Sequence, residues 1–139
     1  MENKIKLTHL ALILFILGAI HFVLLKTRVY GKNGWVDIPL HIIMGMFLGL
    51  IFFWWQGKLK NLEVSYKLLF IGLVLFGLFG GLIWEGLEII LWKFLPLIGN
   101  YVEIKQTTFS DTFLDLTFDI LGSLIWLVFI RPKTIPKLK

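Results

Sequence analysis

The chain has 139 residues, of which 58% are hydrophobic and 16% aromatic, and it carries a net charge of +5 and no cysteine. Soluble domains contain about 45–50% apolar residues, and a chain this short cannot bury the excess in a water-facing fold. The composition therefore excludes an ordinary soluble protein, and the missing cysteine excludes disulfides and thiolate sites. The basic residues lie between apolar runs, which favours anionic lipid headgroups as their partners and not nucleic acid.

Four apolar stretches are long enough to cross a bilayer as helices, which takes roughly 20 residues. They cover about residues 5–25, 38–55, 68–92 and 112–130. The first begins after lysines, as a signal peptide does, but no small-residue cleavage site follows and the run is long enough to span. The sequence thus predicts an all-α, polytopic membrane protein: one transmembrane domain over residues 1–139, folded as a compact bundle of four transmembrane helices in the cell (inner or plasma) membrane.

The basic residues predict the orientation of these spans. Nine of the 14 lysines and arginines fall in the N-terminal segment, the loop after the second span and the C-terminal tail. Four spans place these three segments on the same side. Because cytoplasmic loops carry the excess of basic residues, both termini are predicted to be cytoplasmic.

In this orientation the acids of the last three spans all fall in the outer half of the membrane. The acids are Asp37 on the second span, Glu85 and Glu88 on the third, and Asp111, Asp115 and Asp119 on the fourth, and His41 of the second span lies at the same level. The three aspartates of the fourth span recur every four residues, so they share one helix face. Glycines such as Gly45 and Gly81 continue the other polar faces, which indicates close helix contact. The acids are therefore expected to point into the bundle and not at lipid.

Several carboxylates inside a membrane need compensation, because each costs about 2.5–3.5 kcal/mol at a central position. Protons, a metal ion, a cationic ligand or neighbouring Lys and Arg are all able to supply it. A hard divalent ion (Mg, Mn, Ca or Zn) suits many carboxylates with one or two imidazoles. The predicted metal ligands are His41, Glu85, Glu88, Asp111, Asp115 and Asp119, with Asp37 as a further member of the site.

Each of these residues also has a structural interpretation. Asp111 lies in a good helix-start sequence, where an acid caps the helix and favours its dipole. Glu85 and Glu88 are able to pair with Lys93, Lys26 or Arg28. His21 lies at a similar depth on the first span, but without an acidic motif, and is interpreted as a hydrogen-bonded packing residue.

Three ordered motifs resemble the YjdF-type family of small bacterial inner-membrane proteins. They are "DIPLHIIMG" with Asp37, His41 and Gly45, then "WEGLE" with Glu85 and Glu88, then "DTFLDLTFDILG" with Asp111, Thr112, Asp115 and Gly122. More distantly, the same set resembles the VanZ-like proteins, which are associated with glycopeptide resistance. The resemblance covers roughly residues 35–123. Two positions depart from the family pattern: Thr108 stands where an acid is expected, and Asp119 where a small or amidic residue is usual. The resemblance implies the architecture and the site residues, and no substrate.

Three functions are compatible with these features. The first is a metal-assisted hydrolase or transferase acting on a lipid or lipid-linked headgroup at the outer leaflet, with His41 or Glu85 as general base. The second is a non-catalytic proton-, cation- or ligand-binding module for transport or resistance. The third is a structural membrane subunit that binds a partner or forms a homo-oligomer. The sequence does not decide whether the protein is an enzyme.

Overall fold

The computed structural model describes residues 6–27, 29, 34–57, 65–94 and 109–129. These residues form four α-helices and one short 3-10 turn. The helices are α1 (Leu7–Lys26), α3 (Asp37–Gln56), α4 (Tyr66–Phe94) and α6 (Phe109–Phe129), and the turn η1 (Gly34–Val36) leads directly into α3. The all-α prediction is confirmed for the part of the chain described. The single domain over residues 1–139 stays a prediction.

Three of the helices are long and apolar enough to cross a membrane, over Leu7–Leu24, Asp37–Gln56 and Tyr66–Ile90. They correspond to the first three predicted spans. The fourth predicted span coincides with α6, which is not among the three and carries Asp111, Asp115 and Asp119. Its role as a span stays a prediction. The termini lie outside the described residues, so their cytoplasmic placement also stays a prediction.

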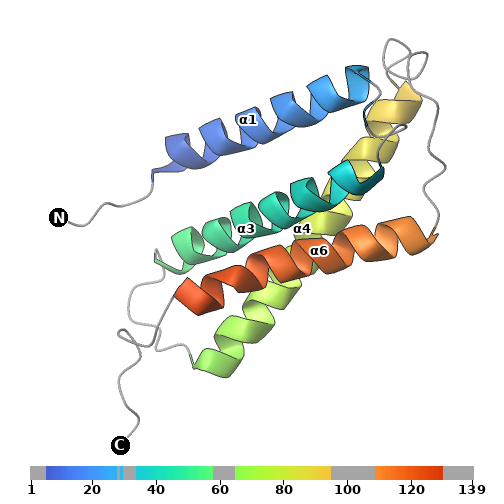
Figure 1. Ribbon diagram of the computed structural model, residues 1–139. Helices are drawn as coiled ribbons and strands as arrows, with labels where there is room; N and C mark the ends of the chain where they lie inside the picture. Colours follow the sequence, from blue (N-terminus) through green and yellow to red (C-terminus); the bar gives the residue numbers. More distant parts are fainter. Residues whose placement is uncertain (1–5, 28, 30–33, 58–64, 95–108, 130–139) are drawn as a thin grey trace, which may run out of the picture.

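The helices run in alternating directions, so that α3 and α6 are parallel to each other and α1 and α4 run the opposite way (Figure 1). α6 packs against both α3 and α4, and α1 packs against α3. The starts of α3 and α6 therefore meet the ends of α1 and α4. We refer to this end of the bundle as the polar end, defined by Asp37, His41, Glu85, Asp115 and Asp119.

Glycines allow α3 and α6 to touch backbone to backbone just beyond the polar end. A Cβ atom on Gly45 would overlap the backbone carbonyl of Asp119, and one on Gly122 would overlap the carbonyl oxygen of Ile42. Small residues at such positions bring helix backbones together in membrane proteins, where van der Waals packing replaces the hydrophobic effect between helices. This contact fixes the register of the two helices.

Polar side chains further along the helices bond to backbone carbonyls. The Trp126 indole nitrogen donates to the Met46 carbonyl oxygen at 2.6 Å. The Ser123 hydroxyl is fully buried and lies 2.9 Å from the Leu73 carbonyl oxygen of α4. These bonds join α6 to each of its neighbours and satisfy its buried donors inside the bundle.

Apolar side chains fill the rest of the interior and cover much of the outside. One buried cluster joins α1 and α3 through Leu10, Leu17, Met44 and Phe47. A second, around Leu73, lies at the end away from the polar residues. Large apolar side chains are exposed on all four helices, as expected for surfaces that face lipid.

Candidate functional site

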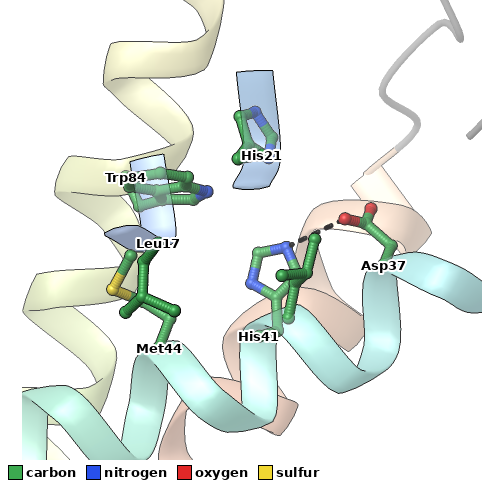
Figure 2. Close-up of a pocket in the computed structure, with 7 residues that line it drawn as sticks. Leu17, His21, Asp37, His41, Met44 and Trp84 are labelled. Carbon is green, nitrogen blue, oxygen red and sulfur yellow. Dashed lines mark ion pairs between the residues drawn. The ribbon is translucent and has the colours of Figure 1, made fainter. Parts of the chain in front are cut away.

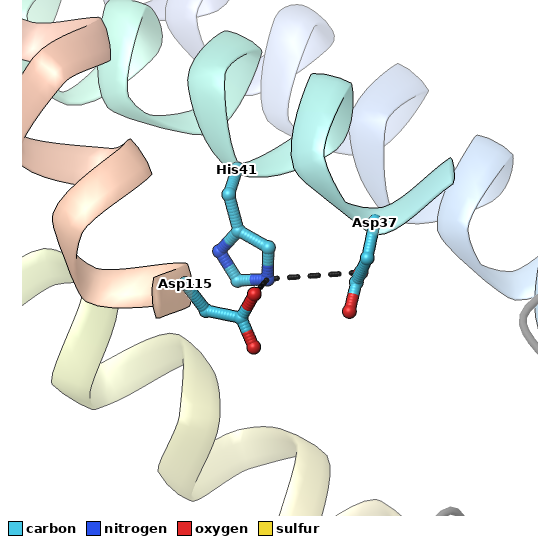
Figure 3. A group of neighbouring side chains, drawn as sticks. All are labelled: Asp37, His41 and Asp115. Atoms are coloured by element: carbon cyan, nitrogen blue, oxygen red, sulfur yellow. Dashed lines mark ion pairs between the residues drawn. The ribbon is translucent and has the colours of Figure 1, made fainter. Parts of the chain in front are cut away.

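His41 is the centre of the polar end. It lies one turn after Asp37 on α3 and is only 3% exposed. Its Nε2 atom is 3.7 Å from Asp37 Oδ1 and 3.7 Å from Asp115 Oδ1 of α6 (Figure 3). The i, i+4 spacing places Asp37 and His41 on one face of α3, and the parallel packing of α3 and α6 brings Asp115 to the same point.

The other ring nitrogen of His41 faces a different carboxylate. Nδ1 lies 3.2 Å from Asp119 Oδ2, within hydrogen-bond distance. Asp119 is one turn after Asp115 on α6 and is fully buried. An ionised carboxylate only accepts hydrogen bonds, so with Asp119 ionised the donor would be Nδ1–H of His41. The imidazole ring is thus held between two aspartates of the same helix face.

Glu85 adds a carboxylate from α4. It is 6% exposed, and its Oε1 atom is 4.0 Å from His41 Nε2. Its other oxygen, Oε2, accepts a hydrogen bond from the Thr112 hydroxyl at 3.2 Å. Three helices therefore direct one imidazole and four carboxylates to one place, and Thr112 orients one of the carboxylates.

The distances around His41 Nε2 are close to those of a metal coordination shell. Ligand atoms that each bind a metal at about 2.0–2.2 Å lie about 3–3.6 Å apart. The separations of 3.7 Å from Nε2 to Asp37 and to Asp115 exceed this range only slightly. Each of these three residues offers one ligand atom, and the three atoms lie within 4.8 Å of one another. The three residues therefore form a group that could hold one metal ion.

Glu88 belongs to a neighbouring pair and not to the group around His41. Its Oε1 atom is 3.2 Å from His21 Nε2 of α1. The His21 ring also packs edge-on against Trp84, with 5.1 Å between ring centroids. Glu85 and Glu88, three residues apart on α4, thus face different histidines.

A small cavity lies between the two histidines (Figure 2). Its volume is about 10 Å³, and it is lined by Leu17, His21, Asp37, Leu40, His41, Met44 and Trp84. Space of this size holds about one water molecule where polar partners are available. Here His21, Asp37 and His41 provide them, so the cavity is suited to a water molecule beside the candidate metal site.

Five of the seven predicted site residues come together: Asp37, His41, Glu85, Asp115 and Asp119. Of the other two, Glu88 contacts His21, and Asp111 is partly buried one turn before Asp115. Sequence reasoning missed the His21–Glu88 pair and the bond from Thr112. The available signals were the depth of His21 and the threonine of the "DT" motif. The side chain of Lys93 and the whole of Arg28 lie outside the described part of the chain.

Comparison with known proteins identifies the family. A family model described as "Predicted membrane protein (DUF2238)" matches residues 1–132. The chain belongs to this family. It is the YjdF-type family expected from the three motifs, and the more distant resemblance to VanZ-like proteins stays a prediction. No curated protein and no solved structure matches the chain.

Membership in this family agrees with the fold. The family description and the three apolar helices show that the chain is a membrane protein with several membrane-compatible helices. The cell membrane as its location stays a prediction. The family description carries no activity, so the function has to be argued from the residues around His41.

Proposed function

We propose that this protein binds a divalent metal ion at the polar end and uses it to act on a phosphate-bearing lipid or lipid-linked headgroup at the outer leaflet of the cell membrane. The observation that carries the proposal is the surroundings of His41 Nε2. Carboxylate oxygens of Asp37, Asp115 and Glu85 lie 3.7, 3.7 and 4.0 Å from it. This donor set, rich in hard oxygen with one imidazole, suits Mg, Mn, Ca or Zn.

Charge supports a metal ion over a single proton as the compensating species. Four carboxylates surround one imidazole in a largely buried space, and even a charged imidazole would balance only one of them. A divalent ion supplies two further positive charges and draws the carboxylate oxygens together. Metal sites made of inward-facing acids and histidines on separate helices are known in other helix bundles.

The geometry supports a division of the site residues into metal ligands and a candidate base. His41, Asp37 and Asp115 have ligand atoms at suitable separations, so we assign these three to the metal. Glu85 Oε1 is slightly farther from His41 Nε2, and its other oxygen is held by Thr112. Glu85 is therefore the candidate general base, and it would accept a proton from the attacking water, which a bound metal would make more acidic. His41, a second candidate base in the sequence, is a better ligand.

The position of the site in the bundle supports a headgroup as substrate. Asp37 is the first residue of α3, and Asp115 is six residues from the start of α6, which is about 9 Å along the helix axis. With both termini in the cytoplasm, this depth is just below the outer surface, where lipid phosphates lie. A metal ion at that level neutralises phosphate charge and polarises the bond to be broken.

Transport, the second function compatible with the sequence, receives less support from the described residues. A transport path needs polar groups on both sides of the site. Beyond Asp119 the next buried polar residue on α6 is Ser123, whose hydroxyl is bonded to backbone carbonyls of Leu73 and Ile120. Gly45 and Gly77 bring α3 and α4 against the α6 backbone at this level. The described helices thus form a packed layer below the site.

Metal analysis of the purified protein tests the proposal. Wild-type protein and Asp115→Ala would be purified in detergent, incubated with Mg, Mn, Ca and Zn, desalted and measured by inductively coupled plasma mass spectrometry. We expect one divalent ion per chain in the wild type and its loss in Asp115→Ala with the helix content intact. Wild-type protein that retains no metal would refute the proposal.

The lipid part of the proposal needs a separate assay. Metal-loaded protein in vesicles would be incubated with phosphorylated lipids, and release of phosphate or of the phosphorylated headgroup would be followed. We expect turnover that stops when the metal is chelated and is lost in Glu85→Gln. If the protein binds metal but turns over none of these lipids, it is a metal-binding protein, and the proposed enzymatic activity is refuted.

A further inference from the structure

Asp119 has a different position from the other acids around His41. The oxygens of Asp37, Asp115 and Glu85 lie near Nε2, whereas Asp119 Oδ2 lies 3.2 Å from Nδ1 on the other side of the imidazole ring. A metal ion bound to Nε2 is out of reach of a carboxylate that contacts Nδ1. The sequence predicts Asp119 to be a metal ligand, and its contact with Nδ1 favours a different role.

We propose that Asp119 is a positioning residue that fixes the tautomer and the orientation of the His41 ring. This inference rests on the proposed metal site for its functional consequence. Neutral imidazole has one N–H group, and donation from Nδ1 to Asp119 places the proton on Nδ1. The lone pair of Nε2 then points at Asp37 and Asp115. Metal-binding histidines are commonly held in this way by a carboxylate on the second nitrogen.

The packing around Asp119 leaves its carboxylate little freedom. A Cβ atom on Gly45 would overlap its backbone, and one on Gly81 would crowd its Oδ2 atom. α3 and α4 therefore approach Asp119 from two sides, at positions where only glycine fits without displacement. The side chain is held against the His41 ring by the same close helix contacts that fix the bundle.

The second oxygen of Asp119 argues against a purely structural role. Oδ1 is buried and has no hydrogen-bond partner among the described residues. A buried carboxylate with an unpaired oxygen is destabilising, and an apolar residue of similar size would avoid this penalty. The contact with Nδ1 of His41 explains why a carboxylate stands at this position, whereas packing alone does not.

The test combines nuclear magnetic resonance with metal titration of the full chain in detergent. Protein labelled with ¹⁵N-histidine would be prepared as wild type, Asp119→Asn, Asp119→Ala and the control Ser123→Ala, with His41→Gln to assign the resonances. In metal-free wild type, at a pH high enough for the His41 ring to be neutral, we expect the Nδ1–H tautomer. Asp119→Ala should give a mixture of tautomers, whereas Asp119→Asn retains an acceptor and should keep most of the Nδ1–H form. The His41 tautomer should be the same in Ser123→Ala as in wild type, and the His21 resonances should be the same in all these variants.

Titration with Mn²⁺ then measures the consequence for the metal. We expect affinity to fall about 10–100-fold in Asp119→Ala, with less loss in Asp119→Asn and an unchanged stoichiometry. An unchanged His41 tautomer in Asp119→Ala would overturn the inference, as would an affinity equal to that of the wild type. If wild type binds no Mn²⁺, the proposed function fails alone. The tautomer measurement in metal-free protein still decides for or against Asp119.

Discussion

The contact between α3 and α6 has two regions with opposite chemistry. At the polar end, His41 of α3 meets Asp115 and Asp119 of α6. One to two turns further along the helices, Gly45 and Gly49 of α3 meet the α6 backbone and the side chain of Trp126. The same two parallel helices form both regions, so the regions differ only in their side chains.

This difference separates function from stability along one helix pair. In the glycine region, backbone contact and bonds to carbonyls satisfy the buried polar atoms, as membrane helices require. At the polar end, several carboxylates are gathered around one imidazole, an arrangement that is costly without a compensating cation. Substitutions in the two regions should therefore have different consequences, the first mainly for folding and the second mainly for ligand binding.

The largest expected effect is loss of metal on changing His41. Outer-sphere changes at metal sites weaken binding about 10–100-fold, and removing a direct ligand should exceed this. His41→Ala should thus abolish stoichiometric Mn²⁺ binding, as measured by isothermal titration. His21→Ala is the matched control, because His21 pairs with Glu88, and it should bind Mn²⁺ as wild type does. An equal loss of Mn²⁺ binding in both variants would show that His21 and His41 belong to one metal site.

A methyl group in the glycine region should destabilise the bundle. Gly45→Ala places a Cβ atom against the Asp119 backbone, and overpacking of this kind costs about 1–3 kcal/mol or more. The matched control is Gly86→Ala, since a Cβ there has no neighbour within 4 Å and alanine favours the helix. Unfolding by SDS titration should show a lower free energy for the first variant alone. Equal stabilities would show that α3 and α6 are not in backbone contact.

The two glutamates of α4 should separate into different roles. Glu85 lies near His41 and Glu88 near His21. Glu85→Gln removes a negative charge beside the metal and should weaken Mn²⁺ binding about tenfold, as outer-sphere changes do. Glu88→Gln should leave the affinity within a factor of two or so and instead loosen α1. A larger loss of Mn²⁺ affinity in Glu88→Gln than in Glu85→Gln would indicate that Glu88 is a metal ligand, as the sequence predicts.

The smallest effect should come from Ser123. Its buried hydroxyl bonds to the Leu73 carbonyl of α4, and loss of one such bond costs about 1 kcal/mol. Ser123→Ala should therefore lower the free energy of unfolding slightly while Mn²⁺ affinity stays at the wild-type value. A change in affinity would mean that the packed layer and the polar end are energetically coupled.

The helices and the faces of the acids were predictable because both depend on local spacing. Apolar runs of about 20 residues predicted α1, α3 and α4, and the four-residue interval placed Asp115 and Asp119 on one face. The ordered motifs also predicted the family, and the match to the family model over residues 1–132 confirmed it. These features need no knowledge of which helices touch.

The partners of the individual side chains were not predictable in the same way. Glu85 and Glu88 share a helix face, and only the position of α1 relative to α4 decides that one meets His41 and the other His21. Asp115 and Asp119 are equivalent by spacing, yet they face different nitrogens of one ring. Such assignments depend on rotations of whole helices by a fraction of a turn, which the sequence pattern does not specify.

The central claim is that Nε2 of His41 binds a metal ion among carboxylates, and electron spin echo spectroscopy of Mn²⁺-loaded protein tests it most directly. We expect modulation from a single imidazole ¹⁴N nucleus in wild type and in His21→Ala, and none from any Mn²⁺ that His41→Gln still binds. Mn²⁺ bound without nitrogen coupling, or with a coupling that survives in His41→Gln, would contradict the account.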